Sequence, residues 1–368
     1  MVVLVLALLE GVARVVWSDR QAPTTKDGLS MLQGNPYLLF EYAPGVYREH
    51  GVEIRINAMG LRGPQPAQSA PDGVRRFLTT GDSSIFGFMV PEAAVFSAVA
   101  SQQLGEGVEA INGAVPGYSS FQSINLLRMR ALQTAPDLVV IGNLWSDNNF
   151  DSFVDKDLMA TTIAYERSGL GHLAGLLSHS ALYRSLDWVL RVERRAEKIQ
   201  TVSWQVGNPE HIGPRRVEIN DYAENLETLV QLAHHHGAEA AFVLLANQED
   251  LDNPTEVNGW DPYRQVMRDT AARHGTPLLD VITLFQASGQ SREQLFLDVM
   301  HPTVEGHRIM GEALAELLAD WAAGMVVEGS GHGGAMPRYT DPLGERNAER
   351  GQHTDPSPSR TPDLPPSP

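Results

Sequence analysis

The feature that most constrains this chain is a regular alternation of short apolar segments and amphipathic segments between residues 75 and 323. Five apolar segments are predicted as strands, and they span residues 75–80, 108–111, 138–141, 240–245 and 277–282. Between and after them, apolar residues recur at helical spacing in residues 91–104, 120–132, 222–236, 261–274 and 304–323. Purely apolar strands are typical of parallel sheets that are buried on both faces. The pattern therefore predicts an α/β fold, a three-layer α/β/α sandwich around a parallel sheet.

The regions that flank this alternation have a different composition. Residues 18–34 are polar and are predicted as a linker, and strand-like patterns follow at 38–42 and 52–56, so that residues 18–72 form a linker and an N-terminal β segment. The main domain then covers residues 73–324. The tail, residues 325–368, holds eight of the 23 prolines and very few large apolar residues. Such a composition cannot bury enough surface to fold alone, so we expect the tail to be disordered.

Residues 149–216 interrupt the strand–helix alternation with a long helical insertion. Much of this stretch has a helical composition, most clearly Leu182 to Lys198. Two interpretations are open. The insertion forms a lid or a substrate wall over a site at the sheet edge, or it is an elongated crossover between two strands.

The N-terminus begins with an apolar run from Val2 to Leu9, which Glu10 interrupts. A helix needs roughly 20 apolar residues to span a bilayer, and this run is too short. It also lacks the basic region and the cleavage site of a signal peptide. We expect residues 1–17 to be a truncated membrane anchor, which would place the domain outside the cytoplasm. The alternative is an amphipathic helix that packs on a soluble domain.

Composition excludes several classes of function. The formal net charge of −17 argues against nucleic acid as a partner. The absence of cysteine excludes disulfides, thiolate catalysis and zinc sites with cysteine ligands. The row His234–His236 lies at the end of a predicted helix, where the helix dipole favours cations and successive side chains diverge, so a structural position is favoured over a metal site.

Three segments at predicted strand ends carry residues suited to catalysis. The first is Gly81-Asp82-Ser83, where a serine just past a strand can project its hydroxyl into the crevice. If a helix begins here, the Ser83 N–H can also bind a developing oxyanion. A turn with a helix cap is the structural alternative for this short sequence.

The second segment runs from Asp298 to His301 and lies directly before the last helix. An aspartate and a histidine three residues apart at a turn can lie on the same side of it. The carboxylate then fixes the tautomer of the ring, and the other ring nitrogen is free to take a serine proton. A capped turn with an exposed histidine is the alternative.

The third segment, residues 111–120, follows the second predicted strand and contains Gly113 and Gly117. A glycine at this place lets the backbone approach a ligand closely and offer an N–H group. The alternative is an ordinary turn in which Ser119 or Ser120 caps the next helix.

Taken together and in this order, these segments resemble the SGNH/GDSL hydrolase superfamily over roughly residues 73–323. Gly81-Asp82-Ser83 resembles its first block, residues 112–120 resemble its second, and Asp298-x-x-His301 resembles its last. The run from Arg55 to Arg62 is similar to the lead-in of membrane-anchored bacterial members. The resemblance implies a flavodoxin-like sheet and an esterase without a metal or an organic cofactor. It also implies Gly117 as an oxyanion donor.

One block departs from the family pattern. The third block commonly contains Gly-x-Asn-Asp, whose asparagine donates to the oxyanion. Here the third strand leads into residues 141–149, and Ser146 stands where asparagine is expected. Ser146 or Asn148 is therefore the candidate for the missing donor, with Asn143 as a further option.

The resulting hypothesis is an enzyme that cleaves a carboxylic ester or an O-acetyl ester, with Ser83 as the nucleophile, His301 as the base and Asp298 as its partner. The substrate would be a small molecule or a glycan ester. Two alternatives are an O-acyltransferase that uses the same triad, and a binding module with weakened catalysis.

Overall fold

The computed structural model describes residues 2–18, 32–177, 179–183, 186, 213–252 and 258–324. Its centre is a sheet of five strands in the order β6-β5-β7-β8-β9, and all four strand pairs are parallel. The strands are β5 (Arg75–Gly81), β6 (Val108–Asn112), β7 (Leu138–Gly142), β8 (Glu239–Leu244) and β9 (Leu278–Asp280). In order of appearance along the chain this arrangement is 2-1-3-4-5, the flavodoxin-like order. The predicted fold class is confirmed.

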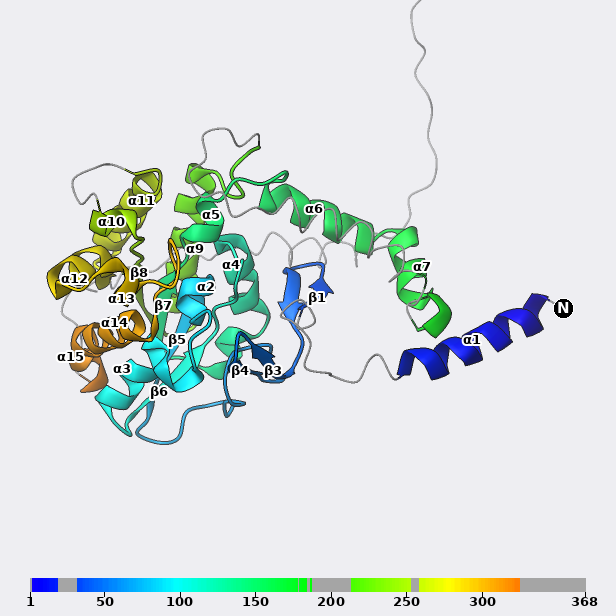
Figure 1. The fold of residues 1–368 in the computed structure, drawn as a ribbon, viewed down its shortest axis with the longest axis horizontal. Helices are drawn as coiled ribbons and strands as arrows, with labels where there is room; N and C mark the ends of the chain where they lie inside the picture. The colour runs from blue at the N-terminus through cyan, green and yellow to red at the C-terminus, as the bar shows by residue number, and fades with distance from the viewer. Residues whose placement is uncertain are drawn as a thin grey trace, which may run out of the picture. The chain divides into compact units, whose positions relative to one another are not determined.

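Helices cover both faces of the sheet, as Figure 1 shows. One layer holds α4 (Ser120–Met129), α9 (Ile219–His235) and α11 (Asp261–His274); α9 contacts both other helices, α9 and α11 contact β8, and α4 contacts β5. The other holds α3 (Phe96–Leu104), α12 (Val281–Ser288) and α14 (Val304–Leu317). The central strand β7 lies between the two layers, and its apolar residues Leu138 through Ile141 are all buried. The core therefore lies on both sides of β7.

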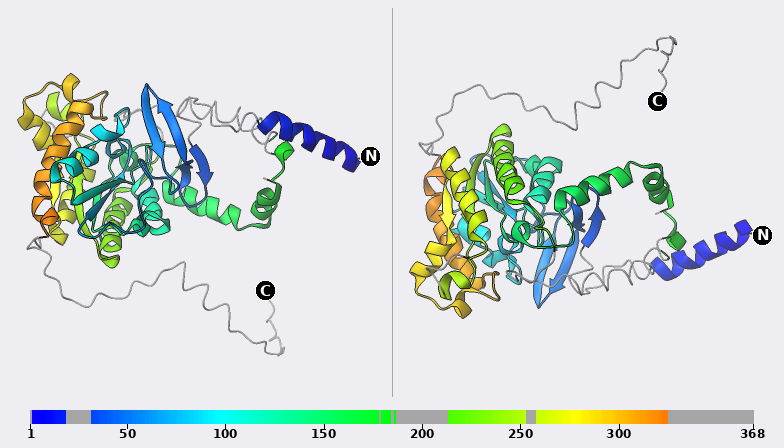
Figure 2. Two further views of the ribbon diagram at one scale, coloured as in Figure 1. Left: turned by 90° about the horizontal axis from the view of Figure 1, so that it is seen from below. Right: turned by 90° about the horizontal axis from the view of Figure 1, so that it is seen from above.

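The N-terminal β segment consists of two antiparallel pairs, which Figure 2 shows as blue arrows. β1 (Leu32–Asn35) pairs with β2 (Leu39–Tyr42), and β3 (Gly45–Glu49) pairs with β4 (Val52–Ile56). The segment is joined to the main sheet through Arg62, which forms isolated bridges to Ile56 and Asn112. The predicted strands at 38–42 and 52–56 are found. The linker predicted at 18–34 overlaps the start of β1, and its residues 19–31 lie outside the described part of the chain.

Several predicted boundaries change where a cap or a tight turn intervenes. The strand predicted at 277–282 ends at Asp280, because the Asp280 carboxylate accepts hydrogen bonds from the N–H groups of Ile282 and Thr283 and starts α12. The helix predicted at 91–104 is divided into a short 3-10 turn, η2 (Glu92–Ala94), and α3. The helices predicted at 120–132 and 304–323 are divided in the same way, with η3 (Ala131–Thr134) after α4 and α15 (Ala319–Ala322) after α14.

The described part of the insertion contains α6 (Asp155–Glu166) and α7 (Gly169–Leu177). The predicted helix at 182–198 lies almost wholly outside the described residues, as does the tail predicted to be disordered. The N-terminal run forms α1 (Val2–Ser18). None of the helices described is long and apolar enough to cross a membrane. The N-terminal anchor stays a prediction.

Candidate active site

The Ser83 turn lies at the carboxyl end of β5, the strand at which the order of the sheet reverses. Ligands bind at such a switch point in open α/β sheets. Ser83 is the first residue of α2 (Ser83–Phe86), and it is 3% exposed. β5 and β7 both end in glycine at paired positions, Gly81 and Gly142. A Cβ at Gly142 would lie 2.3 Å from the side chain of Ile85, so the tight turn into α2 requires the absence of a side chain there.

Asp82 and Ser84 hold this turn against the neighbouring loops. The Asp82 carboxylate is fully buried and accepts hydrogen bonds from the N–H groups of Ser84 and Trp145 at 3.2 and 2.8 Å. Burial raises the pKa of Asp82 to about 6, although these N–H donors oppose the shift. Ser84 Oγ donates to the carbonyl oxygen of Met300 at 3.0 Å and accepts from Trp145 Nε1 at 2.9 Å. Neither side chain has a role predicted from the sequence, where the one local signal is an aspartate that precedes a helix start.

His301 reaches Ser83 from the loop between α13 (Arg292–Leu295) and α14. The distance between His301 Nε2 and Ser83 Oγ is 2.7 Å, and the two residues are 218 positions apart in the sequence. His301 Nδ1 lies 2.7 Å from Asp298 Oδ2. The other carboxylate oxygen, Asp298 Oδ1, accepts hydrogen bonds from the N–H groups of Met300 and His301 at 3.0 and 2.9 Å. The three residues predicted from separate motifs therefore lie in one hydrogen-bonded chain.

The protonation of Asp298 decides the tautomer of His301. Partial burial alone raises the pKa of Asp298, but the hydrogen bond and charge of His301 and the two N–H donors outweigh it and lower that pKa to about 2. The carboxylate is thus ionised at neutral pH and can only accept hydrogen bonds. Nδ1 must therefore carry the proton, which leaves Nε2 as the acceptor for the hydroxyl of Ser83.

Two backbone N–H groups are placed at the strand ends next to this chain. Gly117 lies in the loop after β6, and its φ of +81° is in the region that favours glycine. The N–H groups of Ser83 and Gly117 have no hydrogen-bond acceptor among the residues that the structure describes. Such unpaired donors are what an oxyanion requires.

The loop after β7 forms the short helix α5 (Trp145–Asn148), which contains both predicted oxyanion side chains. Ser146 is 4% exposed, and its hydroxyl has no partner in the described ranges. Asn148 donates from its amide nitrogen to Gly259 O at 3.1 Å, and its amide oxygen accepts from Arg215. Asn143 donates to Ser123 Oγ at 2.9 Å. Of the three, only Ser146 has a side chain without a hydrogen bond.

The aromatic residues near the site have distinct surroundings. Phe88 is partly buried, and its ring centroid lies 4.7 Å from that of His301. Trp145 is buried against Trp260 at 4.7 Å, and Phe86 is buried beneath the guanidinium of Arg62 at 4.5 Å. Phe88 therefore contacts a residue of the hydrogen-bonded chain directly.

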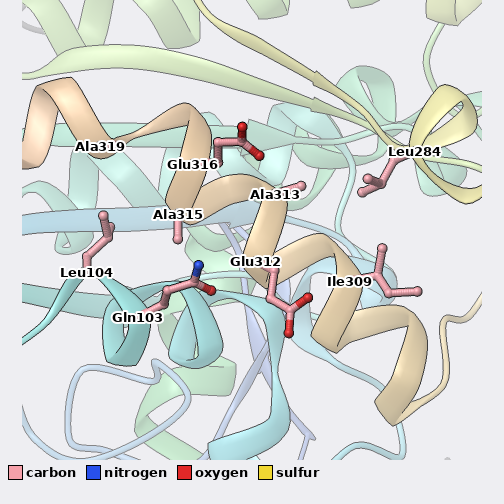
Figure 3. A pocket seen from close by; sticks show the side chains of 9 residues that line it. All are labelled: Gln103, Leu104, Leu284, Ile309, Glu312, Ala313, Ala315, Glu316 and Ala319. Carbon is pink, nitrogen blue, oxygen red and sulfur yellow. The ribbon is translucent and has the colours of Figure 1, made fainter. Parts of the chain in front are cut away.

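A cavity of about 530 Å³ lies elsewhere, between α14 and its neighbours α3 and α12, and Figure 3 shows its lining. It is lined by small and apolar side chains of α3, α12, α14 and α15, together with the polar side chains of Gln103, Glu312 and Glu316. It includes none of the residues of the Ser83–His301–Asp298 chain, so we assign it no part in the chemistry. In the described part of the chain, no cluster of His, Asp or Glu side chains could hold a metal ion.

The chain is similar to several solved structures. A lipolytic protein of the G-D-S-L family from Desulfitobacterium hafniense is 16% identical, and the match covers 66% of this chain and 99% of that one with a TM-score of 0.42. A lipase/acylhydrolase from Enterococcus faecalis is 15% identical over 67% of this chain and 97% of that one, with a TM-score of 0.42. An acetylxylan esterase from Geobacillus stearothermophilus is 14% identical over 66% and 94%, also with a TM-score of 0.42.

No curated protein sequence matches the chain significantly. Residues 194–309 match the model of the GDSL-like lipase/acylhydrolase family. The matched stretch includes Asp298 and His301, while Ser83 precedes it in the sequence. The stretch contains the last block of the predicted motif and ends within α14, so this part of the chain is similar to the GDSL-like lipase/acylhydrolase family.

Proposed function

We propose that this enzyme cleaves carboxylic esters in two steps through a covalent acyl-enzyme on Ser83. The observation that carries the proposal is the continuous chain from Ser83 Oγ to His301 Nε2 and from His301 Nδ1 to Asp298 Oδ2, with 2.7 Å at both links. Such a chain activates a serine, which is a weak nucleophile on its own.

In the first step Ser83 Oγ attacks the ester carbonyl carbon while His301 Nε2 takes its proton. Asp298 stabilises the imidazolium that forms and does not itself take up the proton. The tetrahedral intermediate then collapses, its bond to the alkoxide breaks, and His301 gives the proton to the leaving alcohol. In the second step a water molecule attacks the acyl-enzyme, His301 takes the water proton, and the acid leaves as Ser83 recovers its hydrogen.

The negative oxygen of each tetrahedral intermediate would accept hydrogen bonds from the N–H groups of Ser83 and Gly117 and from Ser146 Oγ. The support for this is that Ser83 follows β5, Gly117 follows β6 and Ser146 follows β7, and these strands are neighbours in the sheet. None of the three donors has an acceptor among the described residues. Losing one such donor costs roughly 100- to 1000-fold in rate.

A fluorophosphonate probe tests the nucleophile. We expect the wild-type enzyme to be labelled and the Ser83→Ala variant not to be labelled, while Ser152→Ala, a change at an exposed serine of the insertion, is labelled as the wild type is. Labelling that persists in Ser83→Ala would contradict the proposal. Hydrolysis of short p-nitrophenyl esters, with and without a sugar acceptor, then separates hydrolysis from acyl transfer by its products.

The proposal for location is that α1 contacts a membrane surface. Its support is that exposed apolar side chains recur at helical spacing and so share one face of this helix, namely Val5, Leu8, Leu9, Val12 and Val15. Sedimentation of the full chain with phospholipid vesicles, compared with a chain that lacks residues 1–18, tests it. Equal sedimentation of the two chains would refute it.

A further inference from the structure

The insertion leaves and rejoins the domain through a narrow stem next to the active site. Two backbone segments, residues 147–155 and 214–217, run antiparallel there. The N–H of Arg216 donates to Asn149 O at 2.8 Å, and the N–H of Asp155 donates to Arg216 O at 2.8 Å. The N–H of Val217 donates to Asp147 O at 3.1 Å. The stem is thus continuous with α5, which carries Ser146.

The buried side chain of Arg216 extends from the stem to the loop after β6. Arg216 is 7% exposed and forms a bidentate ion pair with Asp155, which is fully buried, at 3.0 and 2.8 Å. Its Nη1 donates to the carbonyl oxygen of Gly117 at 2.8 Å, and its Nη2 donates to Gln122 Oε1 at 3.0 Å. The guanidinium therefore joins the stem, the Gly117 turn and the first turn of α4.

Arg216 adds to the hydrogen bonds that hold this turn, which include those from the N–H of Val115 to Gly81 O at 3.1 Å and from the N–H of Tyr118 to Val115 O at 3.0 Å. Gly117 has no side chain, and its own N–H makes no hydrogen bond to the described protein. Gln122 is itself part of a capping box, since its side chain accepts from the N–H of Ser119 at 3.0 Å. Arg216 thus holds the peptide after Gly117 directly and the start of α4 through Gln122.

We propose that Arg216, oriented by Asp155, is a positioning residue that keeps the Gly117 N–H directed at the oxyanion and so couples the insertion to catalysis. The inference rests on the proposed function. Arg216 acts through the Gly117 backbone and does not itself contact the substrate. The planar fork of the guanidinium serves the carboxylate, the amide and the carbonyl at once, which a lysine cannot do.

The first experiment compares Arg216→Gln and Arg216→Lys with the wild type on p-nitrophenyl acetate. A donor misplaced by about 1 Å costs on the order of 100-fold. We expect Arg216→Gln to lower kcat about 10- to 100-fold with KM within threefold of the wild-type value, and Arg216→Lys to recover part of the loss. The inhibition constant of a trifluoromethyl ketone, which forms an oxyanion on the serine, should rise by the same factor as kcat/KM falls.

Arg76→Gln is the matched control. Arg76 is also a buried arginine paired with a carboxylate, Glu109, and it also donates to two carbonyl oxygens, but it lies at the opposite end of β5 from Ser83. We expect it to lower the melting temperature while kcat per folded molecule stays within threefold of the wild type.

Asp155→Asn tests the same proposal if Arg216→Gln does not fold, because it weakens the ion pair and leaves the arginine in place. We expect an intermediate loss of kcat and faster amide hydrogen exchange over residues 113–122. If the wild type is active and kcat is unchanged in the Arg216 and Asp155 variants, the role proposed for Arg216 is wrong, while the proposed function stands. A wild-type enzyme that neither hydrolyses esters nor reacts with the probe would overturn the proposed function as well.

Discussion

Replacing Asp298 with asparagine tests the tautomer argument more sharply than replacing it with alanine. Asp298 Oδ1 accepts two main-chain hydrogen bonds, from Met300 at 3.0 Å and from His301 at 2.9 Å. In Asp298→Asn the amide oxygen must take this place, because the amide NH₂ group would face two N–H donors there. The NH₂ group is then directed at His301 Nδ1, which has to accept a hydrogen bond instead of donating one.

The size of the effect follows from these contacts. Turning the amide around would forfeit two hydrogen bonds, about 1 kcal/mol each, and leave two donors unpaired, so the orientation is fixed by at least about 2 kcal/mol. The proton of His301 then resides on Nε2, which cannot accept the Ser83 proton. An inverted tautomer of this kind lowers kcat about 10⁴-fold, or about 5.5 kcal/mol. In Asp298→Ala, water can reach Nδ1, since the Asp298 side chain is 50% exposed, and the productive tautomer stays accessible.

The assay is steady-state hydrolysis of p-nitrophenyl acetate by both variants, with the melting temperature as the control for folding. We expect Asp298→Asn to retain the wild-type melting temperature within about 2 °C, because its two main-chain hydrogen bonds persist, and to be at least about tenfold less active than Asp298→Ala. An Asp298→Asn enzyme that is more active than Asp298→Ala, or that keeps a tenth of the wild-type kcat, would refute the reasoning.

Three further outcomes follow from single side chains. Ser146→Ala should lower kcat roughly 100-fold at unchanged KM, and an unchanged kcat would exclude Ser146 as an oxyanion donor. Burial raises the pKa of Asp147 to about 7, so the folded state holds a proton that the unfolded state releases, and stability should fall as pH rises from about 4 to 7. Asp147→Asn should flatten that slope in urea unfolding at pH 5 and pH 7.5. Arg62→Met removes three hydrogen bonds to carbonyl oxygens within residues 86–90, at about 1 kcal/mol each, and should lower the unfolding free energy by about 3 kcal/mol.

The sheet was predictable because its strands are buried on both faces and are therefore apolar along their length. β7 is the clearest case, since its predicted residues 138–141 are all buried. Where an apolar run continues into a helix, composition alone does not mark the boundary. The strand predicted at 277–282 therefore extends into α12. The Asp280 carboxylate sets that boundary, because it caps α12 once the chain turns after the strand and brings the N–H groups of Ile282 and Thr283 to it.

The Ser83, His301 and Asp298 side chains were predictable because each lies in a short local motif. Buried ion pairs between distant residues have no such motif. Asp250 is 7% exposed and pairs with Arg264, which is fully buried on α11. Arg216 lies 99 residues after Gly117, and no spacing in the sequence relates the two.

Ser146 stands where the family pattern has asparagine, and the contacts between its loop and the loop after β6 bear on whether a serine can donate there. A serine hydroxyl reaches less far than an asparagine amide, so it can serve an oxyanion only if the α5 turn is held close to the loop after β6. The Asp147 carboxylate does this directly, because it accepts hydrogen bonds from both the N–H and the hydroxyl of Ser120 at the start of α4. Arg216, at the end of the insertion, donates a hydrogen bond to Gly117 O in the same loop. Rigid attachment of the two loops is therefore the physical condition under which the shorter side chain can replace the longer one.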